Sequence, residues 1–356
     1  MRAKDILSKE YSKYINVFES PDRKQFNKMQ RIYSKMENDP AIIDELWAVI
    51  SRKMADDEGN IQDRIIYALQ PENTDPERDQ EFAEGILEGL VSAIDKTEGT
   101  NEERIAFANT LGSKSHIDTK ALMQPLAGWS DWLIGSEFSK RLFSTMFNWP
   151  AFRSDNKGPG EVALALLSPQ IKLSKTKGDI VVDGTPVEVK GGKTSSGGRL
   201  SPTDGTLGNL YKNKEFWMAL LPNDEEKAKQ LATINKVNAN NYDAFLAKFD
   251  LGPAESLKIL SALFKHPGAQ PLIKQVAAKG QDVKARDLIG IAVKNYGESQ
   301  GDDHYLIIQQ DIQTSMYFFI DDLDPVYNRL SFSLPLIDSD ARSQGKAQIG
   351  ILARQR

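Results

Sequence analysis

The sequence predicts an α/β protein in which a helical N-terminal domain, residues 1–148, precedes an α/β core. Three observations lead to this prediction. Apolar residues recur at helical spacing up to about residue 148, β-branched runs with turn residues follow Pro150, and further strand-like runs close the chain. The core is assigned to residues 149–221 and 299–356, and a helical insertion, residues 222–298, separates its two parts.

The N-terminal domain is predicted to be helical because its apolar residues follow a period of about 3.6 residues. Two helix starts are marked by Asp39-Pro40 and Asp75-Pro76, since aspartate caps a first turn and proline fits inside it. The apolar stripes are expected to form a core. They include Ile42, Ile43, Leu46, Trp47, Ile50, Phe82, Ile86, Leu87, Leu90, Val91 and Ile94.

The first part of the core is predicted to contain a β-hairpin. Residues 180–182 form an apolar strand, Asp183-Gly184 marks the turn, and Val187 and Val189 lie on the second strand. A short helix with the sequence EVALALL precedes the hairpin, and a loose glycine-rich segment, GGKTSSGGRLSPTDG, follows it.

The insertion and the C-terminal part complete the predicted order of elements. Asn223 and Glu226 have the spacing of a capping box at the first helix of the insertion. Four strand-like runs then follow, with the sequences YLIIQQ, SMYFFID, RLSFSLPLI and AQIGIL. These strands are expected to complete the core, residues 299–356.

Composition excludes several classes of protein. The 356 residues contain no cysteine, which excludes a disulfide framework, cysteine-based zinc or iron–sulfur sites and a cysteine nucleophile. The three histidines, His116, His266 and His304, are too far apart in the chain to suggest a histidine-rich metal site. Any metal is therefore expected to be a hard cation that carboxylates hold.

Charge and hydropathy bear on location and partners. No apolar run approaches the ~18 residues that cross a bilayer, and the N-terminal segment is charged throughout, so no membrane segment or secretory signal is expected. We expect a cytoplasmic protein, in a host cytoplasm or a virion if a phage encodes it. The net charge of −5 argues against coating nucleic acid by bulk charge but allows a local basic groove.

Four residues form the sharpest chemical signal: Glu161, Asp179, Glu188 and Lys190. Because side chains alternate along a strand, Glu188 and Lys190 are expected on one face and the valines beside them on the other. A hairpin register that buries the apolar face brings Asp179 near Glu188. Glu161 begins the preceding helix, which can lie over the same sheet.

Such a group of charges suits phosphodiester hydrolysis. Two nearby carboxylates resist ionisation unless a cation joins them, and Mg²⁺ or Mn²⁺ would do so through oxygen ligands. The metal can polarise a phosphoryl oxygen and lower the pKa of a bound water. Lys190 could then orient or deprotonate that water, or stabilise the charge of the transition state.

Gly178-Asp179, Glu188-Val189-Lys190 and the upstream Glu161 resemble the PD-(D/E)xK nuclease superfamily, which has a restriction-endonuclease-like fold. The pattern is closest to Holliday-junction resolvases and lambda-type exonucleases. The resemblance covers about 30 residues. It implies an αβββαβ core and Mg²⁺-dependent cleavage of DNA.

The resemblance also implies roles for single residues. Asp179 and Glu188 would be metal ligands, the backbone carbonyl of Val189 a third ligand, and Glu161 an auxiliary acidic ligand. Lys190 would act on the water. The superfamily's proline before the aspartate is replaced here by Gly178. A string found on a helix in one branch, Gln-x-x-x-Tyr, occurs at 313–317 but runs into an apparent strand.

Basic residues around the hairpin suggest DNA as the partner. Between residues 172 and 215 there are eight basic and five acidic residues, in a chain that is acidic overall. Contacts between such residues and phosphates supply most sequence-independent affinity. The predicted DNA contacts are Lys175, Lys177, Lys193, Arg199 and Lys212.

Two functions follow as alternatives. The first is a Mg²⁺-dependent nuclease, endonuclease or exonuclease, that hydrolyses DNA through a metal-bound water. The second is a non-catalytic DNA-binding or assembly protein, for example in a phage particle, built on the same fold. A charged D…E-x-K pattern also arises by chance on surface strands. The helical N-terminal domain could position DNA, bind a protein partner or form a homo-oligomer.

Overall fold

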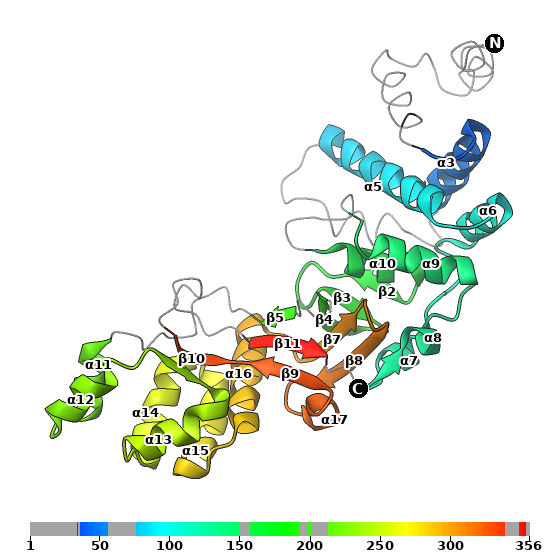
Figure 1. The fold of residues 1–356 in the computed structure, drawn as a ribbon. Coiled ribbons are helices and arrows are strands. Elements are labelled where there is room, and N and C mark those ends of the chain that lie inside the picture. Colours follow the sequence, from blue (N-terminus) through cyan, green and yellow to red (C-terminus); the bar gives the residue numbers. More distant parts are fainter. Residues whose placement is uncertain are drawn as a thin grey trace. The chain divides into compact units, whose positions relative to one another are not determined.

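A computed structural model of the chain describes residues 34, 36–55, 76–149, 157–192, 198–200, 213–338 and 349–353. The chain divides into two compact units, whose elements are labelled in Figure 1. Unit 1 comprises the residues up to 113 together with residues 137–159. Unit 2 comprises residues 114–136 together with those from 160 onward. The fold is of the α/β class, as predicted, because unit 2 contains a mixed sheet with helices around it.

The main helices of unit 1 are α3 (Pro40–Ala55), α5 (Pro76–Lys96), α6 (Asn101–Thr110) and α9 (Glu137–Met146). α3 and α5 begin at the prolines that the sequence marks, and Asp39 Oδ1 accepts a hydrogen bond from the Ala41 N–H at 2.8 Å. Six stripe residues of α3 and α5 are fully buried: Ile43, Leu46, Ile50, Leu90, Val91 and Ile94. The helical spacing of this part is therefore that of core-facing helices.

Unit 2 is built around a six-stranded mixed sheet with the order β1-β8-β7-β4-β3-β2. The strands are β1 (Ala127–Gly128), β2 (Ile171–Leu173), β3 (Ile180–Val182), β4 (Thr185–Gly192), β7 (His304–Gln309) and β8 (Thr314–Phe319). β4 and β7 are parallel, and every other neighbouring pair is antiparallel. Two helices precede strands of this sheet along the chain: α10 (Pro159–Leu167) comes before β2, and α16 (Ala285–Gln300) comes before β7.

The register assigns the side chains of β4 to two faces of the sheet. Val187 is paired with Ile180, whereas Glu188 is paired with Tyr305 and Lys190 with Ile307. Both faces of β4 are covered, since Val187 is 1% exposed and Glu188, on the other face, is 8% exposed. The apolar face predicted for the hairpin is buried, but the charged face is covered as well.

The remaining elements of unit 2 follow β4 along the chain or precede α10. Two small sheets pair β6 (Lys236–Asn238) with β10 (Pro335–Asp338), and β11 (Ile349–Ala353) with β5 (Gly198–Leu200) and β9 (Leu330–Ser333). The longer helices are α11 (Lys214–Leu220), α12 (Glu225–Leu231), α13 (Tyr242–Lys248), α14 (Pro253–Leu263) and α15 (Gln270–Ala277). Three short helices are α7 (Thr119–Leu122), α8 (Trp129–Trp132) and α17 (Asp324–Tyr327).

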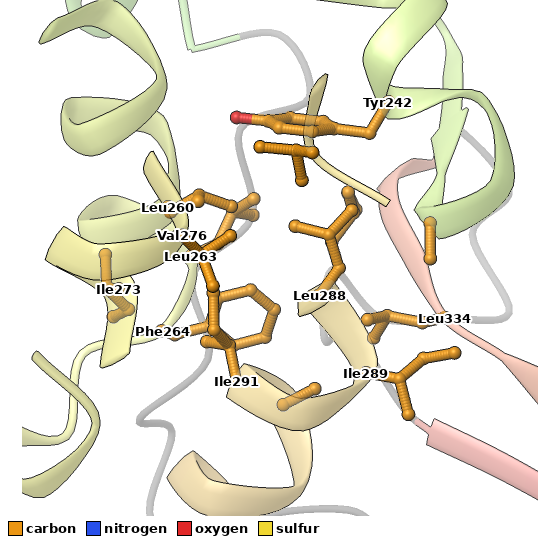
Figure 2. Close-up of a cluster of buried hydrophobic side chains, with 14 of the residues drawn as sticks. Tyr242, Leu260, Leu263, Phe264, Ile273, Val276, Leu288, Ile289, Ile291 and Leu334 are labelled. Atoms are coloured by element: carbon orange, nitrogen blue, oxygen red, sulfur yellow. The ribbon is translucent and has the colours of Figure 1, made fainter. Parts of the chain in front are cut away.

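A large apolar cluster joins these helices to the sheet. Figure 2 shows side chains from α14, α15 and α16 packed together, with Phe264 and Ile291 among them. The same cluster of buried residues reaches Tyr305 and Ile307 of β7 and Phe318 of β8. Burial of this apolar surface holds α16 against the face of the sheet that carries Glu188.

The division of the chain differs from the predicted boundary at residue 148. Residues 114–136, assigned from the sequence to the N-terminal domain, group with unit 2 because β1 pairs with β8. Most of α16 falls inside the predicted insertion, residues 222–298, yet its Tyr296 packs on Tyr305 of the sheet with ring centroids 6.1 Å apart. Both differences arise from contacts between segments that are distant along the chain.

Candidate active site

The β3–β4 hairpin positions the predicted acidic residues. Its turn has positive φ at Asp183 (47°) and Gly184 (87°), as a tight two-residue hairpin turn requires. Asp183 Oδ2 accepts a hydrogen bond from the Thr119 hydroxyl at 2.5 Å, so this aspartate joins the hairpin turn to α7. The register pairs Ile180 with Val187, so Asp179, which directly precedes β3, and Glu188, which follows Val187, lie at the same end of this pairing.

Gly178 makes the turn that leads into Asp179. Its φ is +65°, and a Cβ on this residue would lie 2.8 Å from backbone atoms of Val187. Its N–H donates a hydrogen bond to Asp302 Oδ1 at 2.7 Å. Proline has no N–H and a negative φ, so the proline of the PD-(D/E)xK pattern could not occupy this position.

Asp179 lies directly against β4. Its N–H donates to the Val187 carbonyl at 2.9 Å. Its Oδ2 accepts from the Val189 N–H, also at 2.9 Å. The carboxylate is thus fixed beside the strand that carries Glu188. Because nearby like charges repel, this arrangement is costly unless a positive charge compensates it.

Glu188 is the centre of a buried polar group. Its Oε1 forms an ion pair with the Lys190 ammonium and accepts a hydrogen bond from the Tyr296 hydroxyl at 3.1 Å. Burial raises the pKa of Glu188, the positive charge of Lys190 lowers it, and the negative charges of Asp179 and Asp302 raise it further. The net direction is upward, as expected where several carboxylates share one site.

Lys190 supplies the positive charge of this group. Its side chain is 22% exposed, so the ammonium is largely withdrawn from water. Burial alone would lower the pKa of Lys190, but attraction to Glu188 and Tyr296 outweighs it and raises the pKa above its ordinary value. Two carboxylates and one ammonium therefore lie close enough at the β3–β4 hairpin to affect one another's charge.

Three residues that the sequence did not single out complete the site: Tyr296, Asp302 and Tyr305. Tyr296 is 5% exposed and Tyr305 is fully buried, and the Tyr305 ring stacks on Phe318 with centroids 5.3 Å apart. Tyr296 lies on the apolar side of α16. The only feature of the sequence that could have indicated it is a tyrosine, with its polar hydroxyl, at a position that faces the core. Asp302 had no sequence signal, because its partner Gly178 is 124 residues away.

Glu161 is placed differently from these residues. It lies half-buried in the first turn of α10. In the part of the chain that the structure describes, no group of three or more histidine, aspartate or glutamate side chains is arranged to hold a metal ion. Glu161 therefore does not complete a cluster of three carboxylates with Asp179 and Glu188, and its role as an auxiliary ligand stays a prediction.

No family model, curated protein or solved structure matches this chain. Among the described residues, none of the helices combines the length and the apolar character that crossing a membrane requires.

The donor set fits a hard cation. Asp179 and Glu188 offer carboxylate oxygens from neighbouring strands, and the chain contains no cysteine to favour a softer metal. Strand alternation puts His304 on the face opposite Tyr305, where its Nδ1 lies 2.5 Å from the Tyr317 hydroxyl oxygen. Mg²⁺ commonly uses one or two carboxylates and keeps several waters, so two carboxylates are sufficient.

The predicted DNA contacts can be followed only in part. Lys175 and Lys177 are exposed in the turn between β2 and β3, immediately before Asp179. Lys193 and Lys212 lie outside the described residues, and of Arg199 only its place in β5 is described. Two of the five predicted basic residues therefore lie in the turn that leads into Asp179.

Proposed function

We propose that the chain is a Mg²⁺- or Mn²⁺-dependent deoxyribonuclease. The observation that carries this proposal is the close approach of Asp179, Glu188 and Lys190 at the β3–β4 hairpin. Two nearby carboxylates with one adjacent ammonium are costly in a partly buried site, and they suit the binding of a divalent cation and a phosphodiester.

The order of elements supports the same proposal. Along the chain, α10 is followed by the antiparallel strands β2, β3 and β4, then by α16 and by β7, which is parallel to β4. An αβββαβ core is what the resemblance to PD-(D/E)xK nucleases implies. Asp179 lies immediately before β3, and Glu188 lies in the middle of β4, a central strand of the sheet.

Each residue has a distinct part in the proposed reaction. Asp179, Glu188 and the Val189 carbonyl would hold the cation, which when bound polarises the phosphodiester and activates water. The ammonium of Lys190, which its raised pKa keeps protonated, orients the attacking water or stabilises negative charge on the phosphoryl oxygens. Lys175 and Lys177 attract the phosphates of the neighbouring backbone.

Cleavage assays with charge-neutral variants test the proposal. Supercoiled, linear and branched DNA are incubated with the full chain and Mg²⁺ or Mn²⁺, with and without EDTA. We expect metal-dependent cleavage that falls at least about 100-fold in Asp179→Asn, Glu188→Gln and Lys190→Met, because losing ~3 kcal/mol of transition-state stabilisation has that effect.

Glu225→Gln and Lys229→Met are the matched controls. These two residues form an exposed ion pair within α12, so each variant removes the same kind of charge away from the hairpin. Both should cleave like the wild type. DNA binding without cleavage, unchanged by substitutions at Asp179 and Lys190, would contradict the proposal and favour a non-catalytic DNA-binding or assembly protein.

A further inference from the structure

The C-terminal end of α16 and the residue after it contact Glu188 and the turn that precedes Asp179. Tyr296 lies near this end, Gly301 ends the helix in the left-handed conformation with φ +74°, and Asp302 follows it. Both Tyr296 and Asp302 are less than 8% exposed, so their polar atoms must find partners inside the protein.

The first contact is from Tyr296 to Glu188. The hydroxyl of Tyr296 donates to Glu188 Oε1, the oxygen that also pairs with Lys190. A carboxylate that accepts from two fixed donors has little freedom to rotate. The ring of Tyr296 is supported in turn by Tyr305, which stacks on Phe318 of the next strand.

The second contact is from Asp302 to the turn before Asp179. Asp302 Oδ1 accepts from the Gly178 N–H at 2.7 Å, and this turn sets where Asp179 enters β3. Asp302 is itself fixed, because its N–H donates to the Gly297 carbonyl at 2.9 Å. Two residues at the end of α16 thus bond to Glu188 and to the turn that leads into Asp179.

We propose that Tyr296 and Asp302 are positioning residues that set the separation of Asp179 and Glu188 for cation binding. This inference rests on the proposed function. Neither residue needs to touch the cation. Outer partners of metal ligands commonly matter by about 10–100-fold in metal affinity, because they hold the ligands in the binding geometry.

Mn²⁺ binding to the full chain, measured without DNA by isothermal titration calorimetry, tests the contact to Glu188. Tyr296→Phe should weaken binding about 10-fold, and the Mg²⁺ concentration that gives half-maximal cleavage should rise by a similar factor. The matched control is Tyr242→Phe, which removes the hydroxyl of another buried tyrosine, bonded to Ser256 at 3.2 Å. This control should bind Mn²⁺ like the wild type.

A pair of variants tests the contact to Gly178. Asparagine keeps a side-chain oxygen that can accept from the Gly178 N–H, whereas alanine removes it. Asp302→Ala should therefore bind Mn²⁺ about 10-fold more weakly, and Asp302→Asn should remain close to the wild type. Equal losses in both variants would mean that the charge of Asp302, not its hydrogen bond, matters, and would overturn the proposal.

The failures of the two proposals are distinguishable. A wild-type chain that binds no Mn²⁺ and cuts no DNA overturns the proposed function and this inference together. A wild type that binds and cuts, with Tyr296→Phe unchanged in both measurements, overturns this inference alone. If Asp302→Ala does not fold, Tyr296→Phe against Tyr242→Phe still decides the result.

Discussion

Gly178 shows how one residue without a side chain can decide the geometry of the site. It combines a left-handed φ with a close approach to the backbone of Val187 and a hydrogen bond to Asp302. Asp179 follows it directly, so any change in this turn moves the carboxylate. The resemblance to PD-(D/E)xK nucleases identified the position as a departure from the usual proline, and the backbone explains the departure.

We predict that Gly178→Ala destabilises the protein more than Gly184→Ala. Both glycines have positive φ, which costs alanine about 1 kcal/mol or more, but only at Gly178 would the new Cβ lie 2.8 Å from backbone atoms, whereas nothing lies within 4 Å at Gly184. Urea unfolding should show a loss of about 1 kcal/mol for Gly184→Ala and at least about 2 kcal/mol for Gly178→Ala. Equal losses would contradict the steric explanation.

The charged residues of the hairpin were predictable because they follow one another on a strand. Glu188 and Lys190 are two positions apart, so alternation alone puts them on one face. Tyr296 and Asp302 were not predictable in the same way. Their contacts depend on the crossover that brings α16 and β7 beside β4, and no local spacing encodes that pairing.

At the scale of elements, α16 packs so closely at Gly297 that no side chain fits there. A Cβ on Gly297 would lie 2.1 Å from Ile320 Cδ1, 2.7 Å from the Asp302 carbonyl oxygen and 3.0 Å from the Tyr305 hydroxyl oxygen. The isoleucine side chain could move, but the backbone oxygen could not do so without shifting Asp302. The glycine therefore allows the last turn of α16 to reach the site.

We predict opposite effects for two alanine substitutions in this helix. Gly290→Ala should stabilise the protein by up to about 1 kcal/mol, because nothing lies within 4 Å of its new Cβ and alanine favours the helix. Gly297→Ala should destabilise it by about 1–3 kcal/mol, because the last turn is overpacked. Thermal unfolding measures both effects, and a similar gain in both variants would refute the close packing of this turn.

Helix starts were predicted more reliably than their exact caps. α3 begins at Pro40 as expected, but α12 is capped by Asp224, whose side chain accepts from the Lys227 N–H at 3.0 Å, and not by Asn223. Both residue types cap helices well, so the pattern could not separate adjacent candidates. Which of the two neighbours, Asn223 or Asp224, becomes the N-cap depends on the backbone path that enters α12.

At the scale of the whole molecule, buried ionisable groups link stability to pH. His116 is 4% exposed, and its backbone N–H donates to the Leu167 carbonyl at the end of α10. Burial lowers the pKa of His116 from 6.5 to about 4, and the nearby charge of Lys114 adds to this. The unfolded chain therefore binds a proton below pH 6.5 that the folded chain does not bind until about pH 4.

We predict that stability declines as the pH falls from 6.5 toward 4 and that His116 contributes to this decline. The neutral His116 contributes fully to the free energy of unfolding above pH 6.5. Between pH 7 and pH 5 the wild type should lose about 1–2 kcal/mol more than His116→Gln, which cannot take up the proton. Urea unfolding of both proteins at the two pH values measures the difference, and identical slopes would show that His116 is protonated equally in both states.

The parallel pairing of β4 with β7 has a consequence for biosynthesis. β4 ends at Gly192 and β7 begins at His304, so roughly 110 residues are translated between them. At ~5–20 residues per second, the nascent hairpin waits on the order of 10 s for its neighbour. Tyr296 and Asp302 leave the ribosome in the same late interval. The carboxylate pair therefore gains its contacts with Tyr296 and Asp302 only after this interval, and a nascent chain that has reached only β4 lacks both.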